Sequence, residues 1–270
     1  MTHGPWLALF TAAFLRLLRI DRPLLAFTFN HGNGRFFSGP FLTLARRVLP
    51  SVAAFVTHSE YERQIFVRLY RIPEERIHFT HWAVAPPEIN PDASQSLGQD
   101  SGFVCCIGRN NRDLPTFIEA VRRSAIPGII VCGAGQIADG DLPSNLTVLT
   151  DIPKAKCDAI MAMAFATVVP LRDDSTGAGH MTIVTSLLLG TPVIATDSPV
   201  VTDYIREGET GLLVKRGSAQ ALTDAFIRLR DEPGLHSALA EGGRRFAQDN
   251  LTEAVAVRFL RGLLEAQAVE

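Results

Sequence analysis

The sequence predicts an α/β protein of two doubly wound, Rossmann-like domains, of which the first is reduced. Short apolar runs typical of buried parallel strands alternate with amphipathic helical stretches along most of the chain. A polar stretch rich in turn residues and without periodicity interrupts this alternation once, as an interdomain linker does. We therefore expect a first domain over residues 1–90, a linker over 91–100 and a second domain over 101–270.

The composition is that of an ordinary globular chain. Of the 270 residues, 47% are hydrophobic and 20% are charged, with a net charge of −2, which excludes disordered, collagen-like and disulfide-stapled classes. The four cysteines form no CxxC pair, so we expect neither a disulfide framework nor a paired metal site. Residues 1–90 hold ten arginines and six acidic residues, whereas 91–270 hold 16 basic and 22 acidic residues. The first domain therefore suits an anionic partner, although an ordinary solvated face would give the same count.

The first domain is expected to contain three strands and three helices. Ser59, followed by Glu62 at the third position, forms a capping box that starts one of the helices. The other expected elements are helices over 5–19 and 40–48 and strands over 24–29, 53–57 and 76–79.

The helix at 5–18 is apolar almost all round. It is too short to span a bilayer, which needs about 20 apolar residues, and it lacks the basic start and the cleavage site of a secretion signal. Two roles stay open: a core helix of an α/β layer, or an interfacial helix with Arg16, Arg19 and Arg22 at lipid headgroups. We expect a cytoplasmic protein, in the second case with peripheral contact to the inner membrane face through residues 5–22.

The second domain restarts the alternation more completely. Ligands of open parallel sheets bind beyond the carboxyl ends of the strands, at the point where the strand order switches, so the loops after the strands are the places to search. The expected strands cover 103–107, 128–132, 146–149, 166–169, 192–195 and 211–214, and helices over 219–230, 235–248 and 253–266 end the chain.

The loop after strand 103–107 contains Gly108, Arg109, Arg112 and Asp113. Two guanidinium groups at a strand end, beside the amides of a starting helix, suit a diphosphate. The alternative is that Asp113 is an ordinary N-cap and that both arginines are solvated.

The loop after strand 128–132 begins with Gly133 and Gly135 and matches a dinucleotide-binding fingerprint, with Asp151 at the acidic position. That fingerprint requires a helix to start in the loop, and the turn residues at 139–143 leave room for barely one helical turn. A nicotinamide-dependent dehydrogenase is therefore disfavoured.

The loop at 170–182 enters an apolar helix. Gly177 and Gly179 allow the backbone to approach a ligand, and the helix directs its first amides at an anion. His180 and Thr182 add donors at the same end. A plain glycine-rich turn would explain the glycines but not the polar side chains. The loop at 196–199 could close the same pocket, although Thr and Ser there are also common turn residues.

Together these stretches resemble the carboxyl-terminal half of retaining glycosyltransferases of the GT-B fold, in the large group 1 (family 4-like) set that includes sucrose synthases and mannosyltransferases. Upstream, residues 56–60 and 71–77 resemble the end of that family's acceptor domain. The similarity covers 101–232 and is carried by residues 107–109, 131–135, 169–170, 189–196 and 208–214.

The resemblance implies that the second domain binds a nucleoside-diphosphate sugar. Arg109 and Arg112 would neutralise the departing diphosphate, assisted by the amides around Gly179 and His180, and 151–153 would be the base-binding loop. A fixed positive field there lowers the barrier to transfer. The implied nucleotide-sugar-binding residues are Gly108, Arg112, Gly133, Gly135, Asp151, Ile152, Pro153, Asp174, Ser175, Gly177, Gly179, His180, Thr182 and Thr185, and the implied catalytic residues are Arg109 and His31.

Two departures from the family pattern stand out. Gly177 and Thr185 occupy positions where the family usually has glutamates, the second of which commonly holds the ribose; Thr185 could still bind a hydroxyl. The first domain has about half the usual length. Within it, His31 is the best candidate to face the sugar, with a local turn role as the alternative.

We therefore expect a retaining, metal-independent sugar transferase of polysaccharide biosynthesis. It would use a UDP-, GDP- or ADP-sugar without a cofactor, act on a glycan or lipid-linked acceptor, and have no nucleic-acid partner. A non-catalytic domain that binds a nucleotide or a partner and a sugar-nucleotide epimerase remain as alternatives.

Overall fold

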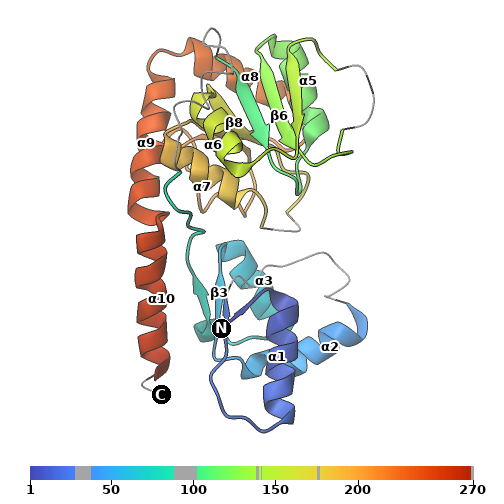
Figure 1. Cartoon of the computed structure of the whole chain (residues 1–270), viewed down its shortest axis with the longest axis vertical. Helices are drawn as coiled ribbons and strands as arrows, with labels where there is room; N and C mark the ends of the chain where they lie inside the picture. The colour runs from blue at the N-terminus through green and yellow to red at the C-terminus, as the bar shows by residue number, and fades with distance from the viewer. Residues whose placement is uncertain (28–37, 88–101, 138–139, 141, 175–176, 269–270) are drawn as a thin grey trace. The chain divides into compact units, whose positions relative to one another are not determined.

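The computed structural model describes residues 1–27, 38–87, 102–137, 140, 142–174 and 177–268 (Figure 1). Its contacts group the chain into two compact units. Unit 1 comprises Met1–Trp82, Asp174–Gly177 and Ala254–Glu270, and unit 2 comprises Ala83–Asp173 and Ala178–Glu253. The predicted second domain runs to residue 270, so the placement of the last helix in unit 1 differs from the prediction.

Unit 1 is built on a parallel four-stranded sheet with the strand order β1-β2-β3-β4. The sequence predicts three of these strands; β1 has two residues and is too short to leave a periodic pattern. Ser59 caps α3 as expected, because its Oγ accepts a hydrogen bond from the Tyr61 amide at 3.1 Å. The elements are β1 (Thr2–His3), α1 (Pro5–Leu17), β2 (Leu25–Phe27), α2 (Gly39–Val48), η1 (Leu49–Ser51), β3 (Ala54–Thr57), α3 (Glu60–Tyr70), η2 (Glu74–Arg76) and β4 (Ile77–Phe79).

Different helices pack on the two faces of this sheet. On one face, α1, α2 and α3 pack around Phe55 and Phe66. On the other face, Leu263 of α10 (Glu253–Ala268) packs on Leu25, Ala54 and Val56. The periodicity of α10 predicts an apolar stripe, but a stripe does not indicate which sheet it covers. From the sequence, this helix is therefore assigned to the same domain as the helices that precede it.

Unit 2 contains a parallel six-stranded sheet with the order β10-β9-β8-β5-β6-β7. This order confirms the predicted doubly wound fold, and its direction of winding switches between β5 and β8. The strands are β5 (Val104–Ile107), β6 (Gly128–Cys132), β7 (Leu146–Thr150), β8 (Ala166–Val169), β9 (Val193–Thr196) and β10 (Leu212–Val214).

Helices cover both faces of the second sheet (Figure 1). Val104 and Cys106 face the core formed with α5 and α8, whereas Cys105 and Ile107 face the core formed with α6. The four cysteines are free thiols, and burial raises the pKa of Cys105 and Cys106 to about 12, as expected of packing residues. The helices are α5 (Leu114–Ser124), α6 (Lys154–Met163), α7 (His180–Leu189), α8 (Ala219–Asp231) and α9 (Leu235–Asn250).

None of the helices in the described part of the chain is both long enough and apolar enough to cross a membrane.

Candidate nucleotide-binding site

The loops that follow β5, β8 and β9 meet at the switch point of the second sheet. Arg112 and Leu171 form an isolated antiparallel bridge, and the Asp113 amide donates to the Pro170 carbonyl at 2.9 Å. The Leu171 amide donates to Thr196 Oγ1, at the end of β9, at 2.8 Å. Three of the loops selected from the sequence are thus joined into one surface.

Arg112 occupies the centre of this surface. Its side chain folds back over the end of β5 and is only 7% exposed. The guanidinium donates to the carbonyl of Ile107 (3.3 and 3.2 Å), to the carbonyl of Asn110 (3.0 Å) and to Thr182 Oγ1 (3.1 Å). Burial lowers the pKa of Arg112, yet a guanidinium stays charged in proteins. Within the described residues, no acidic side chain is among its contacts.

Two glycines lie next to this arginine. Gly108 has φ +146°, and a Cβ there would lie 2.6 Å from Arg112 Nη2. Gly179 has φ +95°, and a Cβ there would lie 2.8 Å from Val169 Cγ1 and 3.7 Å from Arg112 Nη1. Both positions therefore require glycine for its conformation and for the space that it leaves.

Arg109 lies on the exposed side of the same loop. Its Nη2 is 3.0 Å from Asp151 Oδ1, with side chains 64% and 53% exposed. Gln136 links the loops, because its Nε2 donates to the Arg109 carbonyl and its Oε1 accepts from the Gly133 amide at 2.7 Å. Arg109, Gly133 and Asp151, which the sequence selected separately, are therefore neighbours. Sequence reasoning missed Gln136, since nothing marks one glutamine in a polar loop.

The His180 side chain, which the sequence offers as a donor to a ligand, makes contacts within unit 2. Its ring is buried, with Nε2 2.8 Å from the Val200 carbonyl, and it stacks on Tyr204 with the ring centroids 4.5 Å apart. The imidazole is thus engaged in packing α7 against the loop after β9. What α7 offers a ligand is its N-terminus, where the positive end of the helix dipole lies.

The two threonines of α7 differ in accessibility. Thr182 accepts from Arg112 and donates to the Ile107 carbonyl at 3.3 Å, so it belongs to the arginine's surroundings. Thr185 is only 2% exposed, which leaves a ribose little surface to contact, and its hydroxyl-binding role stays a prediction.

The remaining predicted residues are dispersed. Asp113 is the N-cap of α5, because its carboxylate accepts from the Thr116 amide at 3.2 Å. Ile152 packs in the core beneath α6, and Pro153 is the N-cap residue of that helix. Asp174 and Gly177 belong to the segment that groups with unit 1. His31 and Ser175 lie outside the described residues.

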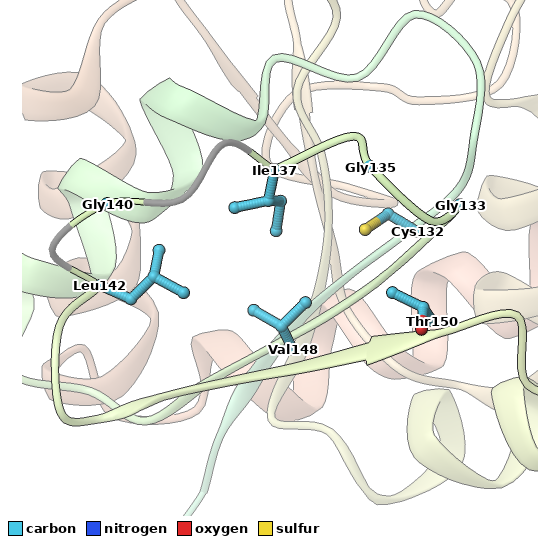
Figure 2. A pocket seen from close by; sticks show the side chains of 8 residues that line it. All are labelled: Cys132, Gly133, Gly135, Ile137, Gly140, Leu142, Val148 and Thr150. Carbon is cyan, nitrogen blue, oxygen red and sulfur yellow. The ribbon is translucent and has the colours of Figure 1, made fainter.

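A pocket of about 390 Å³ lies between the loop after β6 and strand β7 (Figure 2). Figure 2 shows the apolar side chains of Ile137, Leu142 and Val148 around one end of the pocket and Cys132 and Thr150 at the other. Its volume is within the range of small-molecule sites. Residues 133–137 form turns and not a helix start, which agrees with the argument against a dehydrogenase. The lining residues are Cys132, Gly133, Gly135, Ile137, Gly140, Leu142, Val148 and Thr150.

Two Rossmann-like units, with a cationic switch point in the second, define the class of GT-B glycosyltransferase folds. The model of the family "Glycosyl transferases group 1" matches residues 93–246, more than half of the chain. The chain belongs to this family, and the resemblance noted in the sequence is confirmed.

Individual relatives agree with this assignment. The chain is 28% identical over 186 residues to phosphatidyl-myo-inositol mannosyltransferase of Mycobacterium leprae, covering 60% of this chain and 48% of that protein. Sucrose-phosphate synthase from Thermosynechococcus elongatus has a TM-score of 0.81 at 20% identity, with 99% of this chain and 74% of that chain covered. Anabaena HepE, solved with UDP and glucose, has a TM-score of 0.82 at 16% identity, with 97% and 76% covered. The chain spans about half the length of the curated relatives it matches.

Proposed function

We propose that this chain transfers a sugar from a nucleoside-diphosphate sugar to an acceptor, with the diphosphate bound at the carboxyl ends of β5 and β8. The observation that carries the proposal is the buried guanidinium of Arg112, whose hydrogen bonds go to neutral carbonyls and a hydroxyl. A buried charge is costly without a counter-charge. A diphosphate supplies that counter-charge at the position where doubly wound sheets bind ligands.

Arg109 and α7 complete the proposed diphosphate site. The exposed pair of Arg109 with Asp151 is of a kind that contributes at most about 1 kcal/mol. Arg109 can therefore leave Asp151 for a phosphate oxygen at little cost. The N-terminus of α7 follows Gly179, which lies next to the Arg112 guanidinium, and it adds partial positive charge.

The proposed reaction breaks the bond between the anomeric carbon and the β-phosphate oxygen. Negative charge collects on the departing diphosphate, which takes up the proton that the acceptor hydroxyl gives up as it forms the new glycosidic bond. Arg109, Arg112 and the amides of α7 would stabilise that charge without a metal ion. Retention of configuration is proposed from the family resemblance, with His31 as the group facing the sugar.

Support for the donor class comes from the family and from HepE, which was solved with UDP and glucose. We propose a glycan or lipid-linked acceptor, because the mycobacterial relative is named as acting on phosphatidyl-myo-inositol. On this proposal the chain works at the cytoplasmic side of a membrane.

The test is turnover of UDP-, GDP- and ADP-sugars with a panel of glycan and lipid-linked acceptors. Arg109→Ala should lower turnover by roughly 10²–10³, as loss of one preorganised charge does. Arg245→Ala, which removes an equally exposed arginine paired with Glu241 on α9, should leave turnover unchanged. Full turnover by Arg109→Ala would overturn the role of this arginine in the diphosphate site.

A non-catalytic nucleotide-binding role is the second candidate, favoured by Gly177 and Thr185 at the usual glutamate positions. It would show as nucleotide binding without transfer or hydrolysis of any donor. Formation of an epimeric sugar nucleotide in the same assay would instead identify an epimerase.

A further inference from the structure

Helix α1 buries its small apolar side chains and exposes its large ones, which is the reverse of the usual distribution. A helix packed on a sheet normally buries its large apolar residues and exposes polar ones. The fully buried residues of α1 are small or medium in size: Ala8, Leu9 and Ala12. The exposed residues of the same helix and its carboxyl end are the largest ones: Trp6 (45% exposed), Leu7 (55%), Phe10 (48%), Phe14 (63%), Leu17 (77%) and Leu18 (58%).

Helix α2 extends this surface. Phe41 is 44% exposed and Leu44 is 37% exposed. The rings of Trp6 and Phe41 meet edge to face with centroids 5.4 Å apart, and Trp6 stacks on Phe10 at 5.8 Å. The exposed side chains of both helices therefore form one continuous surface, which we call the outer patch: Trp6, Leu7, Phe10, Phe14, Leu17, Leu18, Phe41 and Leu44.

The part of the chain that forms the outer patch is rich in positive charge. Residues 1–59 contain six arginines and a single acidic residue, Asp21. Arg16 Nη1 donates to the Arg47 carbonyl at 2.7 Å, and Arg46 Nε donates to the Leu69 carbonyl at 2.8 Å. These bonds fix the side chains but do not neutralise them. In the described ranges no ion pair joins an acidic side chain to Arg16, Arg19, Arg22, Arg46 or Arg47.

We propose that the outer patch binds the surface of an anionic lipid bilayer. Trp and Phe on a helix that is too short to span suit the boundary between headgroups and acyl chains. The arginines on α1 and α2 and those that follow α1 in the sequence suit lipid phosphates. A second copy of this chain fits less well, because a two-fold contact between outer patches would bring like-charged arginines together. Membrane contact through residues 5–22 is one of the two roles that the sequence leaves open. The structure adds α2 to this surface and shows which side chains are exposed.

Membrane binding by the outer patch and sugar transfer by unit 2 are separate properties, so the failure of one would not contradict the other. If both hold, the acceptor is presented by a membrane.

The test is co-sedimentation of the full chain with vesicles, without any sugar donor. The chain should sediment with vesicles of phosphatidylglycerol and phosphatidylcholine, less so as salt is raised, and much less with phosphatidylcholine alone. The double variant Phe14→Glu and Leu17→Glu should lower binding by roughly tenfold or more. Arg19→Gln and Arg22→Gln should each lower it about fivefold.

The control variant is Val257→Glu and Leu264→Glu, which alters side chains that are 53% and 54% exposed on α10. It should bind vesicles like the unaltered chain. As a second readout, Trp82→Phe leaves Trp6 as the one tryptophan, and its emission should shift to the blue on addition of the mixed vesicles. Circular dichroism checks that each variant is folded.

Two outcomes would overturn the proposal. One is a folded chain that sediments with neither kind of vesicle. The other is a concentration-dependent dimer, abolished by the Phe14→Glu and Leu17→Glu changes, in a chain that does not bind vesicles; the outer patch would then be a self-association surface.

Discussion

A single buried cation organises the end of the second sheet. Arg112 holds the end of β5, the following loop and the first turn of α7 together through one guanidinium. Both glycines next to this side chain have a positive φ, and a Cβ would meet Arg112 at Gly108 and Val169 at Gly179. Stability and ligand binding therefore depend on the same residues here.

Gly179→Ala tests this arrangement. The new Cβ would lie 2.8 Å from Val169 Cγ1 at a φ of +95°, so we expect a loss of about 2–4 kcal/mol from strain and overpacking. Gly208→Ala is the matched control: Gly208 has a φ of +72° with nothing within 4 Å of a Cβ, so only about 1–2 kcal/mol should be lost. Urea unfolding measures both free energies. Equal losses would contradict the steric account.

His58 predicts a pH dependence of stability in unit 1. Its Nδ1 is 2.9 Å from the Thr80 carbonyl, its ring makes edge-to-face contacts with Phe27 and Trp82, and burial lowers its pKa. Below an unfolded-state pKa of about 6.5 the unfolded chain therefore binds the proton more readily, and stability falls as pH falls through that value, by at most about 1.4 kcal/mol per pH unit.

The measurement is the free energy of unfolding at pH 7.5 and pH 5.5 for the unaltered chain and for His58→Gln, which keeps an amide donor for Thr80. The unaltered chain should lose more stability between the two pH values than the variant. An identical loss in both would show that His58 is not the titrating group.

At the residue scale, the sequence identified unusual residue types but not their orientation. Arg112 and Gly179 stand out because charge and glycine are rare beside buried strands, and both are in the described site. The inward turn of Arg112, the bridge made by Gln136 and the stacking of His180 on Tyr204 depend on what neighbouring loops present. No local pattern contains that information.

At the scale of elements, the strands of the second sheet were predicted nearly to the residue. Strands buried on both faces are short continuous apolar runs, and β6 and β8 have the predicted bounds. By contrast, β1 is too short to be periodic. Helix α1 is apolar on all sides, so its pattern does not predict which side is buried; in the structure it is the side of Ala8, Leu9 and Ala12.

The placement of α10 in unit 1 gives a sharp test with adjacent residues. Leu263 is 8% exposed and packs on the sheet of unit 1, so Leu263→Ala should cost about 2–4 kcal/mol in the unfolding of that unit. Leu264 is 54% exposed, and Leu264→Ala should change stability by less than about 0.5 kcal/mol.

Amide hydrogen exchange measures the local stability of each unit separately, because each unit has its own protected strand amides. The expected result is faster exchange in β2 and β3 with Leu263→Ala and no change in β5 and β6. Faster exchange in the second sheet instead would contradict the assignment of α10.

At the scale of the whole molecule, each unit has its own core and its own proposed task. Unit 1 is enclosed by α1 to α3 and α10 and carries the outer patch, whereas unit 2 carries the cationic switch point. Family membership and fold follow from residues 93–246 and were predictable from the sequence. The set of exposed side chains on α1 and α2 could not be predicted, because it depends on which side chains are buried in the core of unit 1.

The most direct test of the central claim is calorimetric titration of UDP, GDP and ADP into the unaltered chain and into Arg112→Gln. One nucleoside diphosphate should bind the unaltered chain. The variant should bind it more weakly by roughly 2–3 kcal/mol, the value of a hydrogen bond to a charged group, while circular dichroism shows the same fold. Equal affinity in both proteins, or no binding of any nucleotide by the folded unaltered chain, would contradict a diphosphate site at the end of β5 and β8.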